Sequence, residues 1–372
     1  MLIGVIAYLA APTQAPAADV QERALLPEIA DGRVSVPIVT ATGVTFYAEG
    51  DGGSAPRVVS DVTGWGERAG GNFDFTVGRM HPIAGTNWFT LTARADQSAR
   101  IEYLFAYGAG DYRTDPHNSR KAPRAGGGEA SEIVMPGFQP PPEFSDPPTM
   151  PAGKVTEAMV KGAIAGERHV IVYTPPGYSR SRQYDLAVFH DGALVVNTGQ
   201  APRVLDWLIA HEKIRPVVAA FVDPVSRTDD FKIAAPMRDF VGGELMTWLA
   251  ERYSVSPVPA DHAVIGISAG ARAALDAMAS YPNMFGKSAL LLPALDDTDV
   301  SRLPVRQTGA PQLEVFLLGA RYDALYGGGT ELARASLTMR GQSVKVLDVA
   351  EGHSTTTWRN HLHDALISLF GR

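Results

Sequence analysis

Ser268 lies at the centre of Gly266-Ile267-Ser268-Ala269-Gly270, which has the pattern G-x-S-x-G. The segment follows a β-branched run and precedes an alanine-rich run of strong helix formers. A strand, a sharp turn and a helix in this order are typical of a nucleophile elbow, where small neighbours accommodate the strained backbone of the serine. The alternative is a serine that only caps the helix. The pattern favours Ser268 as the nucleophile of a hydrolase.

A general base and an acid follow Ser268 in the order found in hydrolases with such an elbow, acid first and histidine second. Asp323 follows a predicted buried strand, and His353 follows the last predicted strand, 85 residues after Ser268 (353 − 268). We expect His353 to accept the serine proton and Asp323 to fix the tautomer of His353. Asp348 and Glu351 are rival acids because both lie close to His353 in the sequence.

Two backbone amides are candidates for an oxyanion hole. The segment His190-Asp191-Gly192-Ala193 follows a predicted strand and contains a glycine, as the second oxyanion loop of these hydrolases does. We expect the N–H groups of Gly192 and Ala269 to hold a tetrahedral oxyanion. An ordinary turn at the end of a strand is the alternative.

Strands and helices are predicted to alternate from His169 to the end of the chain. The predicted strands cover 169–173, 185–190, 217–222, 264–267, 288–292, 313–319 and 344–349, and the predicted helices cover 204–211, 242–252, 271–279, 331–340 and 357–370. This alternation indicates an α/β domain with a mostly parallel sheet covered on both faces.

The residues before His169 have a different character. Short strands are predicted at 44–47, 57–60, 88–92 and 101–107, separated by turn signals, which is typical of an all-β sandwich. Seven prolines between Pro136 and Pro151 predict an extended connector that is neither helix nor central strand. We therefore expect a β-sandwich over 37–136, a proline-rich linker over 137–156 and the α/β domain over 157–372.

The first residues have features of an export signal. Leu2–Ala11 is apolar but shorter than the roughly 20 residues that span a bilayer. The small residues of Ala15–Ala18 suit a signal peptidase site, although no basic residue precedes Arg23. We expect a signal peptide over 1–18, a periplasmic or extracellular protein and no membrane span in the mature chain. An apolar N-terminal strand is the alternative.

The composition excludes several classes of function. A formal charge of −7 without a basic cluster argues against nucleic acid as a partner. The absence of cysteine excludes disulfides, thiolate catalysis and cysteine-based metal sites. We expect no cofactor and no metal, and His361 and His363 lie at a spacing of two, which places them on different faces of a helix. Trp65 and Trp88 could form a sugar platform, but core positions are preferred.

The chain resembles the enterochelin-esterase family. In the C-terminal part, the resemblance rests on Tyr173-Thr174-Pro175-Pro176-Gly177-Tyr178, Phe189-His190-Asp191-Gly192, Gly266-Ile267-Ser268-Ala269-Gly270, Tyr281-Pro282-Asn283-Met284-Phe285-Gly286 and Gly352-His353-Ser354. In the N-terminal part it rests on Val44-Thr45-Phe46, Asp61 to Trp65, Tyr103-Leu104-Phe105 and Asp115-Pro116-His117-Asn118. The resemblance implies an α/β-hydrolase fold preceded by an early-set immunoglobulin-like domain.

The same resemblance implies a function and a set of site residues. The activity would be hydrolysis of a catecholate siderophore ester or its ferric complex by Ser268, His353 and Asp323. Substrate-binding positions would be Arg227, Asp230, His190 and Asp191. Because ferric catecholates are anionic, we also expect the basic residues Arg227, Arg238 and Arg321 near the mouth of the site.

Two other functions stay open. One is a feruloyl or acetyl esterase that acts on plant-wall polysaccharide, with a glycan held by the N-terminal domain. The other is a non-catalytic binding protein on the same fold, which the presence of Ser268, Asp323 and His353 argues against.

Overall fold

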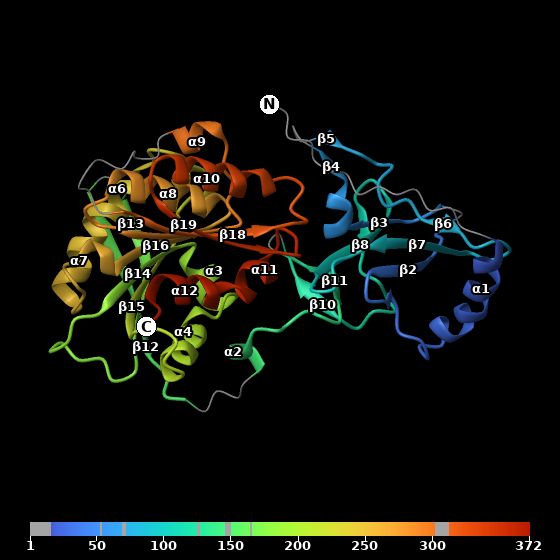
Figure 1. The fold of residues 1–372 in the computed structure, drawn as a ribbon, viewed down its shortest axis with the longest axis horizontal. Coiled ribbons are helices and arrows are strands. Elements are labelled where there is room, and N and C mark those ends of the chain that lie inside the picture. Colours follow the sequence, from blue (N-terminus) through green and yellow to red (C-terminus); the bar gives the residue numbers. More distant parts are fainter. Residues whose placement is uncertain are drawn as a thin grey trace. The chain divides into compact units, whose positions relative to one another are not determined.

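The computed structural model describes residues 16–52, 54–68, 72–124, 127–145, 150–163, 166–301 and 312–372. The chain divides into two compact units (Figure 1). The described residues of Met1–Ala122 and Gly127–Phe138 form the N-terminal unit, and those of Pro123–Gly126 and Gln139–Arg372 form the C-terminal unit. Residues 1–15, which hold most of the predicted signal peptide, lie outside the described residues.

The N-terminal unit consists of a helix and antiparallel sheets. One sheet has the strand order β1-β2-β7-β6, and another has the order β10-β11-β8-β3 with β9 paired to β8; β4 and β5 form a separate pair. The bounds are α1 Pro16–Ala30, β1 Ile38–Val39, β2 Gly43–Glu49, β3 Arg57–Ser60, η1 Asp61–Gly66, β4 Glu67–Arg68, β5 Asn72–Phe73, β6 His81–Pro82, β7 Trp88–Arg94, β8 Arg100–Gly108, β9 Asp111–Arg113, β10 Lys121–Pro123 and β11 Glu129–Val134.

The core of this unit joins its two larger sheets. Phe46 of β2 meets Tyr103 of β8 edge to face, with 5.0 Å between ring centroids, and both side chains are fully buried. All four strands predicted in this part of the chain are present. Helix α1 was not predicted. Its Leu26 and Ile29 pack against Trp88, so tertiary packing stabilises a helix that contains an internal proline.

The C-terminal unit is built on an eight-stranded sheet of order β12-β13-β15-β14-β16-β17-β18-β19. The pairs β12–β13 and β13–β15 are antiparallel, and all pairs from β15 to β19 are parallel. The strand bounds are β12 Lys154–Gly162, β13 Gly166–Thr174, β14 Asp185–His190, β15 Val217–Val222, β16 His262–Ile267, β17 Lys287–Leu291, β18 Glu314–Ala320 and β19 Ser343–Val349.

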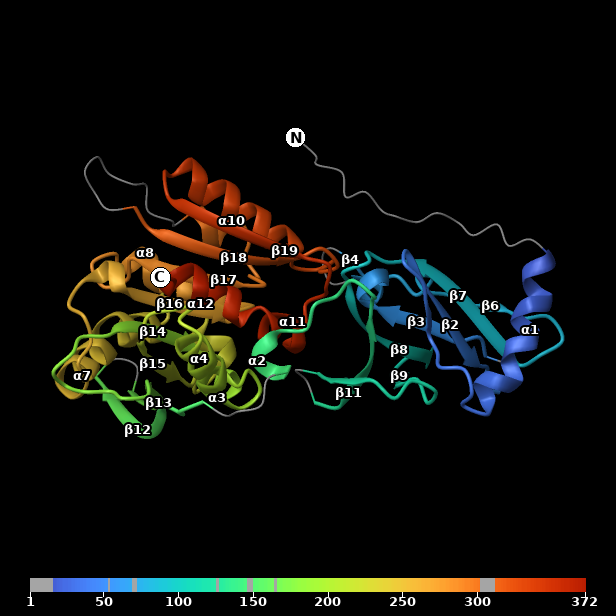
Figure 2. The same ribbon diagram turned by 60° about the horizontal axis from the view of Figure 1, so that its bottom comes forward.

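Helices cover both faces of this sheet (Figures 1 and 2). Leu186 and Val188 of β14 join a core cluster with α7, α8 and α10, whereas Ala187 and Phe189 join the opposite cluster with α4, α11 and α12, because successive side chains of a strand point to opposite faces. The bounds are α2 Pro142–Ser145, α3 Gly192–Asn197, α4 Ala201–Ala210, α5 Arg227–Asp230, α6 Pro236–Asp239, η2 Phe240–Glu244, α7 Leu245–Arg252, η3 Pro259–Asp261, α8 Ala269–Ser280, α9 Asp297–Ser301, α10 Gly327–Met339, α11 Thr355–Asn360 and α12 Leu362–Phe370.

Two predictions for this unit are wrong. The proline-rich stretch contains the short helix α2, which begins at Pro142, and proline is tolerated in a first helical turn because its missing N–H would have no partner there. The single closing helix predicted over 357–370 is two helices. They meet at His361, whose φ of −112° and ψ of 11° are not helical.

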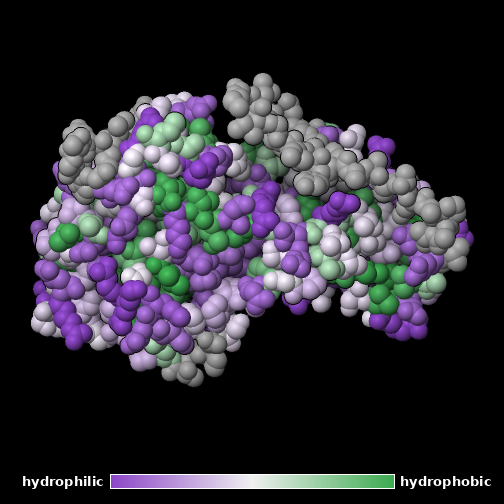
Figure 3. Space-filling model, viewed as in Figure 1, coloured by the Kyte–Doolittle hydropathy of each residue, from purple (hydrophilic) through white to green (hydrophobic). Residues whose placement is uncertain are grey.

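The surface seen in Figure 3 shows hydrophobic areas interspersed among hydrophilic ones. Among the described residues, no helix is both long and apolar enough to cross a membrane.

Candidate active site

Ser268 occupies the turn between β16 and α8, as the elbow pattern predicts. Its φ of 55° and ψ of −117° place it in a backbone conformation that residues other than glycine rarely adopt. A Cβ at Gly266 would overlap the backbone carbonyl group of Gly270. The first glycine of the motif therefore allows the chain to reverse sharply enough to expose the serine at the end of a buried strand.

Replacing Gly266 with Ala is expected to lower the free energy of unfolding by about 3 kcal/mol or more, because the added methyl meets backbone atoms that cannot move independently. Gly270→Ala is the matched control. Its Cβ would lie 3.1 Å from the Asp191 carboxylate and no closer to any backbone atom, so a loss of about 1 kcal/mol or less is expected. Denaturant unfolding of both variants checks this, and equal losses would contradict it.

The three side chains predicted as nucleophile, base and acid form one hydrogen-bonded chain. His353 Nε2 lies 2.9 Å from Ser268 Oγ, and His353 Nδ1 lies 2.7 Å from Asp323 Oδ2. Asp323 is buried, and its Oδ1 accepts a 2.8 Å hydrogen bond from the Tyr326 backbone N–H. One carboxylate oxygen is thus held by the backbone while the other faces the imidazole.

The two rival acids have other partners. The Asp348 carboxylate lies 3.4 Å from the Arg321 guanidinium and is more than half exposed. The Glu351 carboxylate is buried and lies 2.8 Å from His361 Nε2. Both rivals thus pair with groups other than the His353 ring, whereas Asp323 Oδ2 lies 2.7 Å from His353 Nδ1 and is placed to orient it.

The segment with Gly192 lies next to the elbow. Strands β14 and β16 pair in parallel, so α3, which begins at Gly192, and α8, which begins at Ala269, start at the same edge of the sheet. The first N–H groups of a helix lack intrahelical acceptors. The next amide of α3 is already used, because the Ala193 N–H donates to Asp223 Oδ1 at 2.6 Å. Of the first two amides of α3, Gly192 therefore remains the candidate oxyanion donor, at the same sheet edge as Ala269 at the start of α8.

Arg227 connects this loop to the elbow. Its Nε and Nη2 donate to the two oxygens of Asp191 at 2.9 and 3.0 Å, and Nη2 also lies 3.3 Å from the carbonyl oxygen of Ile267. Burial raises the pKa of the Asp191 carboxyl, and the Arg227 guanidinium opposes that rise. Asp191 itself has a left-handed backbone with φ of 58°. The Arg227 side chain is 45% exposed, so it can also face a ligand.

The other residues expected to bind substrate are buried. Asp230 accepts hydrogen bonds from both terminal nitrogens of Arg168, at 3.0 and 2.9 Å. The His190 ring is fully buried against Phe231, and burial lowers its pKa to about 4 although the nearby Asp230 charge opposes this. These positions do not suit a direct contact with substrate. Asp230 and His190 instead support the loop that carries Arg227.

The residues that hydrogen-bond to the start of α3 and to Asp230 were not predicted from the sequence. Asp223, at the end of β15, receives the Ala193 N–H, and its other oxygen lies 2.8 Å from His169 Nδ1. Arg168 neutralises Asp230. Arg168 and His169 are both residues of β13. Nothing in the local sequence links them to Asp230 and Asp223, which lie 62 and 54 positions later in the chain.

The remaining basic residues expected near the mouth also have carboxylate partners. Arg238 lies 2.8 Å from Asp239, and Arg321 pairs with Asp348. Within the described residues, no cluster of histidine and carboxylate side chains has the arrangement of a metal site.

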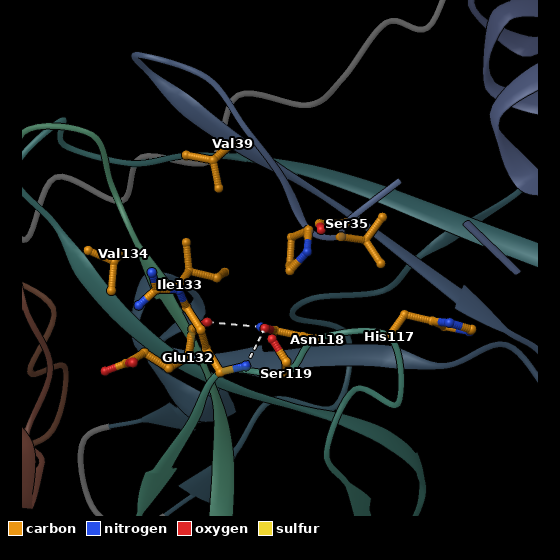
Figure 4. Close-up of a pocket in the computed structure, with 11 residues that line it drawn as sticks. Ser35, Val39, His117, Asn118, Ser119, Glu132, Ile133 and Val134 are labelled. Carbon is orange, nitrogen blue, oxygen red and sulfur yellow. Dashed lines mark hydrogen bonds between the residues drawn. The ribbon is translucent and has the colours of Figure 1, made fainter. Parts of the chain in front are cut away.

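The N-terminal unit has a small hollow of its own (Figure 4). It measures about 180 Å³ and is lined partly by Asn118 and Glu132, whose backbone oxygen accepts the Asn118 amide at 2.9 Å. This volume is below the roughly 300–1,000 Å³ of most small-molecule sites. Trp88 is buried, and Trp65 is half-buried with its indole N–H bonded to Asp61. Trp88 is therefore a core residue, and Trp65 packs against the edge of a second core cluster of this unit.

A family model described as "Putative esterase" matches residues 162–369, more than half of the chain. The chain belongs to this family. The matched range covers strands β13 to β19, the elbow and all three residues of the hydrogen-bonded chain.

Solved esterases share the fold over most of the chain. The enterobactin esterase FES from Shigella flexneri, crystallised in the presence of 2,3-di-hydroxy-N-benzoyl-serine, matches with a TM-score of 0.66 and 21% identity, covering 89% of this chain and 94% of its own. The ferric enterobactin esterase from Salmonella typhimurium matches with a TM-score of 0.68 and 19% identity, covering 90% and 95%. The ferulic acid esterase from the anaerobic fungus Anaeromyces mucronatus matches with a TM-score of 0.52 and 14% identity, covering 61% of this chain and 94% of its own.

One curated relative is more similar in sequence over a shorter range. The uncharacterized protein YjcH from Bacillus subtilis is 27% identical over 138 residues, which span 35% of this chain and 57% of that protein.

Proposed function

We propose that this esterase-family protein is a serine carboxylic-ester hydrolase with an α/β-hydrolase fold. The observation that carries the proposal is the chain of hydrogen bonds from Ser268 Oγ through His353 to Asp323, with distances of 2.9 and 2.7 Å. The strained serine at the end of a buried strand is the second support, because this geometry exposes a nucleophile above the sheet.

Each residue has a defined task in the proposed reaction. His353 Nε2 takes the proton of Ser268 as Oγ attacks the ester carbonyl, and Asp323 stabilises the imidazolium that forms. The backbone N–H groups of Gly192 and Ala269 stabilise the oxyanion. His353 then protonates the leaving alcohol, and water activated by the same imidazole hydrolyses the acyl-enzyme.

For the substrate, we propose an ester of a catecholate siderophore. The support is the extent of the structural match: enterobactin esterases match about nine tenths of the chain and so include residues of both units, whereas the ferulic acid esterase matches 61% of it. Arg227 adds a second support, because an exposed guanidinium beside the elbow suits an anionic substrate.

Product analysis by mass spectrometry tests the substrate class. The full chain is incubated separately with a tricatecholate lactone and with a feruloylated arabino-oligosaccharide, and Ser268→Ala serves as the blank. We expect linear catecholoyl-serine fragments from the lactone and no free ferulate from the oligosaccharide. Release of ferulate with an intact lactone would move the protein to polysaccharide de-esterification and would leave the hydrolytic mechanism standing.

A further inference from the structure

A second histidine–carboxylate pair lies beside the candidate active site. Glu351 is two residues before His353, and its side chain is only 2% exposed. Glu351 Oε1 lies 2.8 Å from His361 Nε2, and His361 Nδ1 lies 3.0 Å from Asp364 Oδ2. Both ring nitrogens therefore face carboxylate oxygens. Only the imidazolium form can donate from both nitrogens at once, so the geometry selects the charged state of His361.

The electrostatic environment also favours the charged imidazole of His361. Burial alone would lower the pKa of His361, but its hydrogen bonds to Asp364 and Glu351 outweigh burial and raise that pKa to about 9. His361 is therefore a cation at neutral pH. Because the pKa in the folded protein is above the ordinary value of about 6.5, the stabilisation is complete below that value and is lost as the pH rises through about 9.

Glu351 connects His361 to both loops of the candidate active site. Its backbone carbonyl accepts the Tyr322 N–H at 3.0 Å, and Arg321 N–H donates to the carbonyl of Val349 at 2.8 Å. These bonds extend the β18–β19 ladder, so backbone hydrogen bonds join the loop that holds Asp323 to the loop that holds His353. The Glu351 side chain then ties both loops to the junction of α11 and α12.

We propose that the imidazolium of His361, through its ion pair with Glu351, is a positioning residue that keeps the His353 ring within proton-transfer distance of Ser268. The inference rests on the hydrolytic function proposed above. His361 does not touch the reacting atoms. It acts by fixing the backbone at Glu351, two residues before His353. The residue after His353, Ser354, is held separately as the cap of α11.

Other charged groups around His361 are part of the same cluster. His363 Nδ1 lies 3.1 Å from Glu143 of α2, and His363 Nε2 lies 3.5 Å from Asp364. Burial by itself raises the pKa of the Asp364 carboxyl. The nearby groups His361, His363 and Lys345 of β19 outweigh burial and lower that pKa below its ordinary value. The pair of His363 and Glu143 serves as the control, because it is a histidine–carboxylate pair whose histidine lies on α12 and whose link to the His361 cluster is the longer 3.5 Å approach of His363 Nε2 to Asp364.

The test compares His361→Gln with His363→Gln in the full chain, measuring kcat, KM and thermal unfolding. We expect His361→Gln to lower kcat by about 10- to 100-fold with little change in KM, because small misplacements of a catalytic group have effects of this size. His363→Gln should leave kcat within about threefold even where its loss of stability is similar. Equal effects of the two variants on kcat would overturn the proposal.

The pH profile supplies a readout that a merely structural role would not give. The kcat of the parent should fall above about pH 9, as His361 loses its proton. In Glu351→Gln, which keeps the side chain shape but removes one carboxylate charge, this alkaline limb should move to lower pH by about one unit or more. In His361→Lys the limb should move upward, since lysine titrates near pH 10.4 or higher beside a carboxylate. A limb that stays in place in both variants would overturn the proposal, whereas an inactive parent would instead refute the hydrolytic function.

Discussion

Replacing Ser268 with Ala is expected to lower kcat for ester hydrolysis by about 10⁴- to 10⁶-fold, the range found when the nucleophile of a serine hydrolase is removed. His353 Nε2 faces Ser268 Oγ and His353 Nδ1 faces Asp323, so neither ring nitrogen is left to activate a second hydroxyl. The residual rate should reflect the oxyanion donors and substrate binding alone. Steady-state hydrolysis of an activated aryl ester measures the loss of kcat. Treatment with a fluorophosphonate, followed by intact-protein mass spectrometry, shows whether the variant has also lost covalent labelling of the serine.

Ser354→Ala is the matched control for this experiment. Ser354 Oγ accepts the Thr357 N–H at 3.2 Å as the cap of α11, so its loss should cost about 1 kcal/mol of stability and lower kcat far less than Ser268→Ala does. A Ser268→Ala protein that keeps its activity would place the nucleophile elsewhere. A parent protein that neither hydrolyses esters nor takes up the label would instead support the binding-protein alternative.

Asp323→Asn is expected to lower kcat by about 10⁴-fold without unfolding the protein, as in other enzymes with this arrangement. The backbone N–H of Tyr326 requires an acceptor, so the amide oxygen of the asparagine should keep the place of Oδ1. Its NH₂ group then points at His353 Nδ1 and makes that nitrogen an acceptor. The proton is left on Nε2, facing Ser268, and this tautomer cannot take the serine proton.

Asp348→Asn distinguishes this effect from a general change of charge near the histidine. Asp348 is on the adjacent strand and pairs with Arg321 at the surface, so its variant should retain kcat within about threefold. Kinetics of the two variants at several pH values provide the measurement. Comparable losses in both would mean that the acid is not Asp323 alone.

The candidate site could be predicted because its chemistry leaves local signals. The motif around Ser268 needs glycine for steric reasons that the structure makes explicit at Gly266. His353 and Asp323 each follow a strand that the sequence shows clearly, and the ends of parallel strands meet at one edge of a sheet. The role of Arg227 as a bridge between Asp191 and Ile267 left no such signal. It depends on how two distant loops approach each other.

The fold divides in the same way between local and non-local information. Strands with continuous apolar runs, such as β14 and β15, begin and end where the sequence indicates. Strand β12 was not predicted, because an edge strand exposed on one side, with Val155 and Met159 open to solvent, lacks a buried pattern. The interruption at His361 was also missed. Its helical neighbours give no warning, and the break is held by Asp364 in the first turn of α12 together with Glu351 from the loop after β19.

The strand order of the C-terminal sheet has a consequence for the synthesis of the protein. From β16 onward each strand is added beside the previous one, so the ribosome delivers the serine elbow well before β19 and the loop that carries His353. Synthesis proceeds from the N-terminus at about 5–20 residues per second, and domains generally fold as units. A nascent chain therefore contains the serine segment before it contains the imidazole that activates the serine. In the proposed mechanism, the three catalytic side chains come together only after β19, the last strand, has paired with β18.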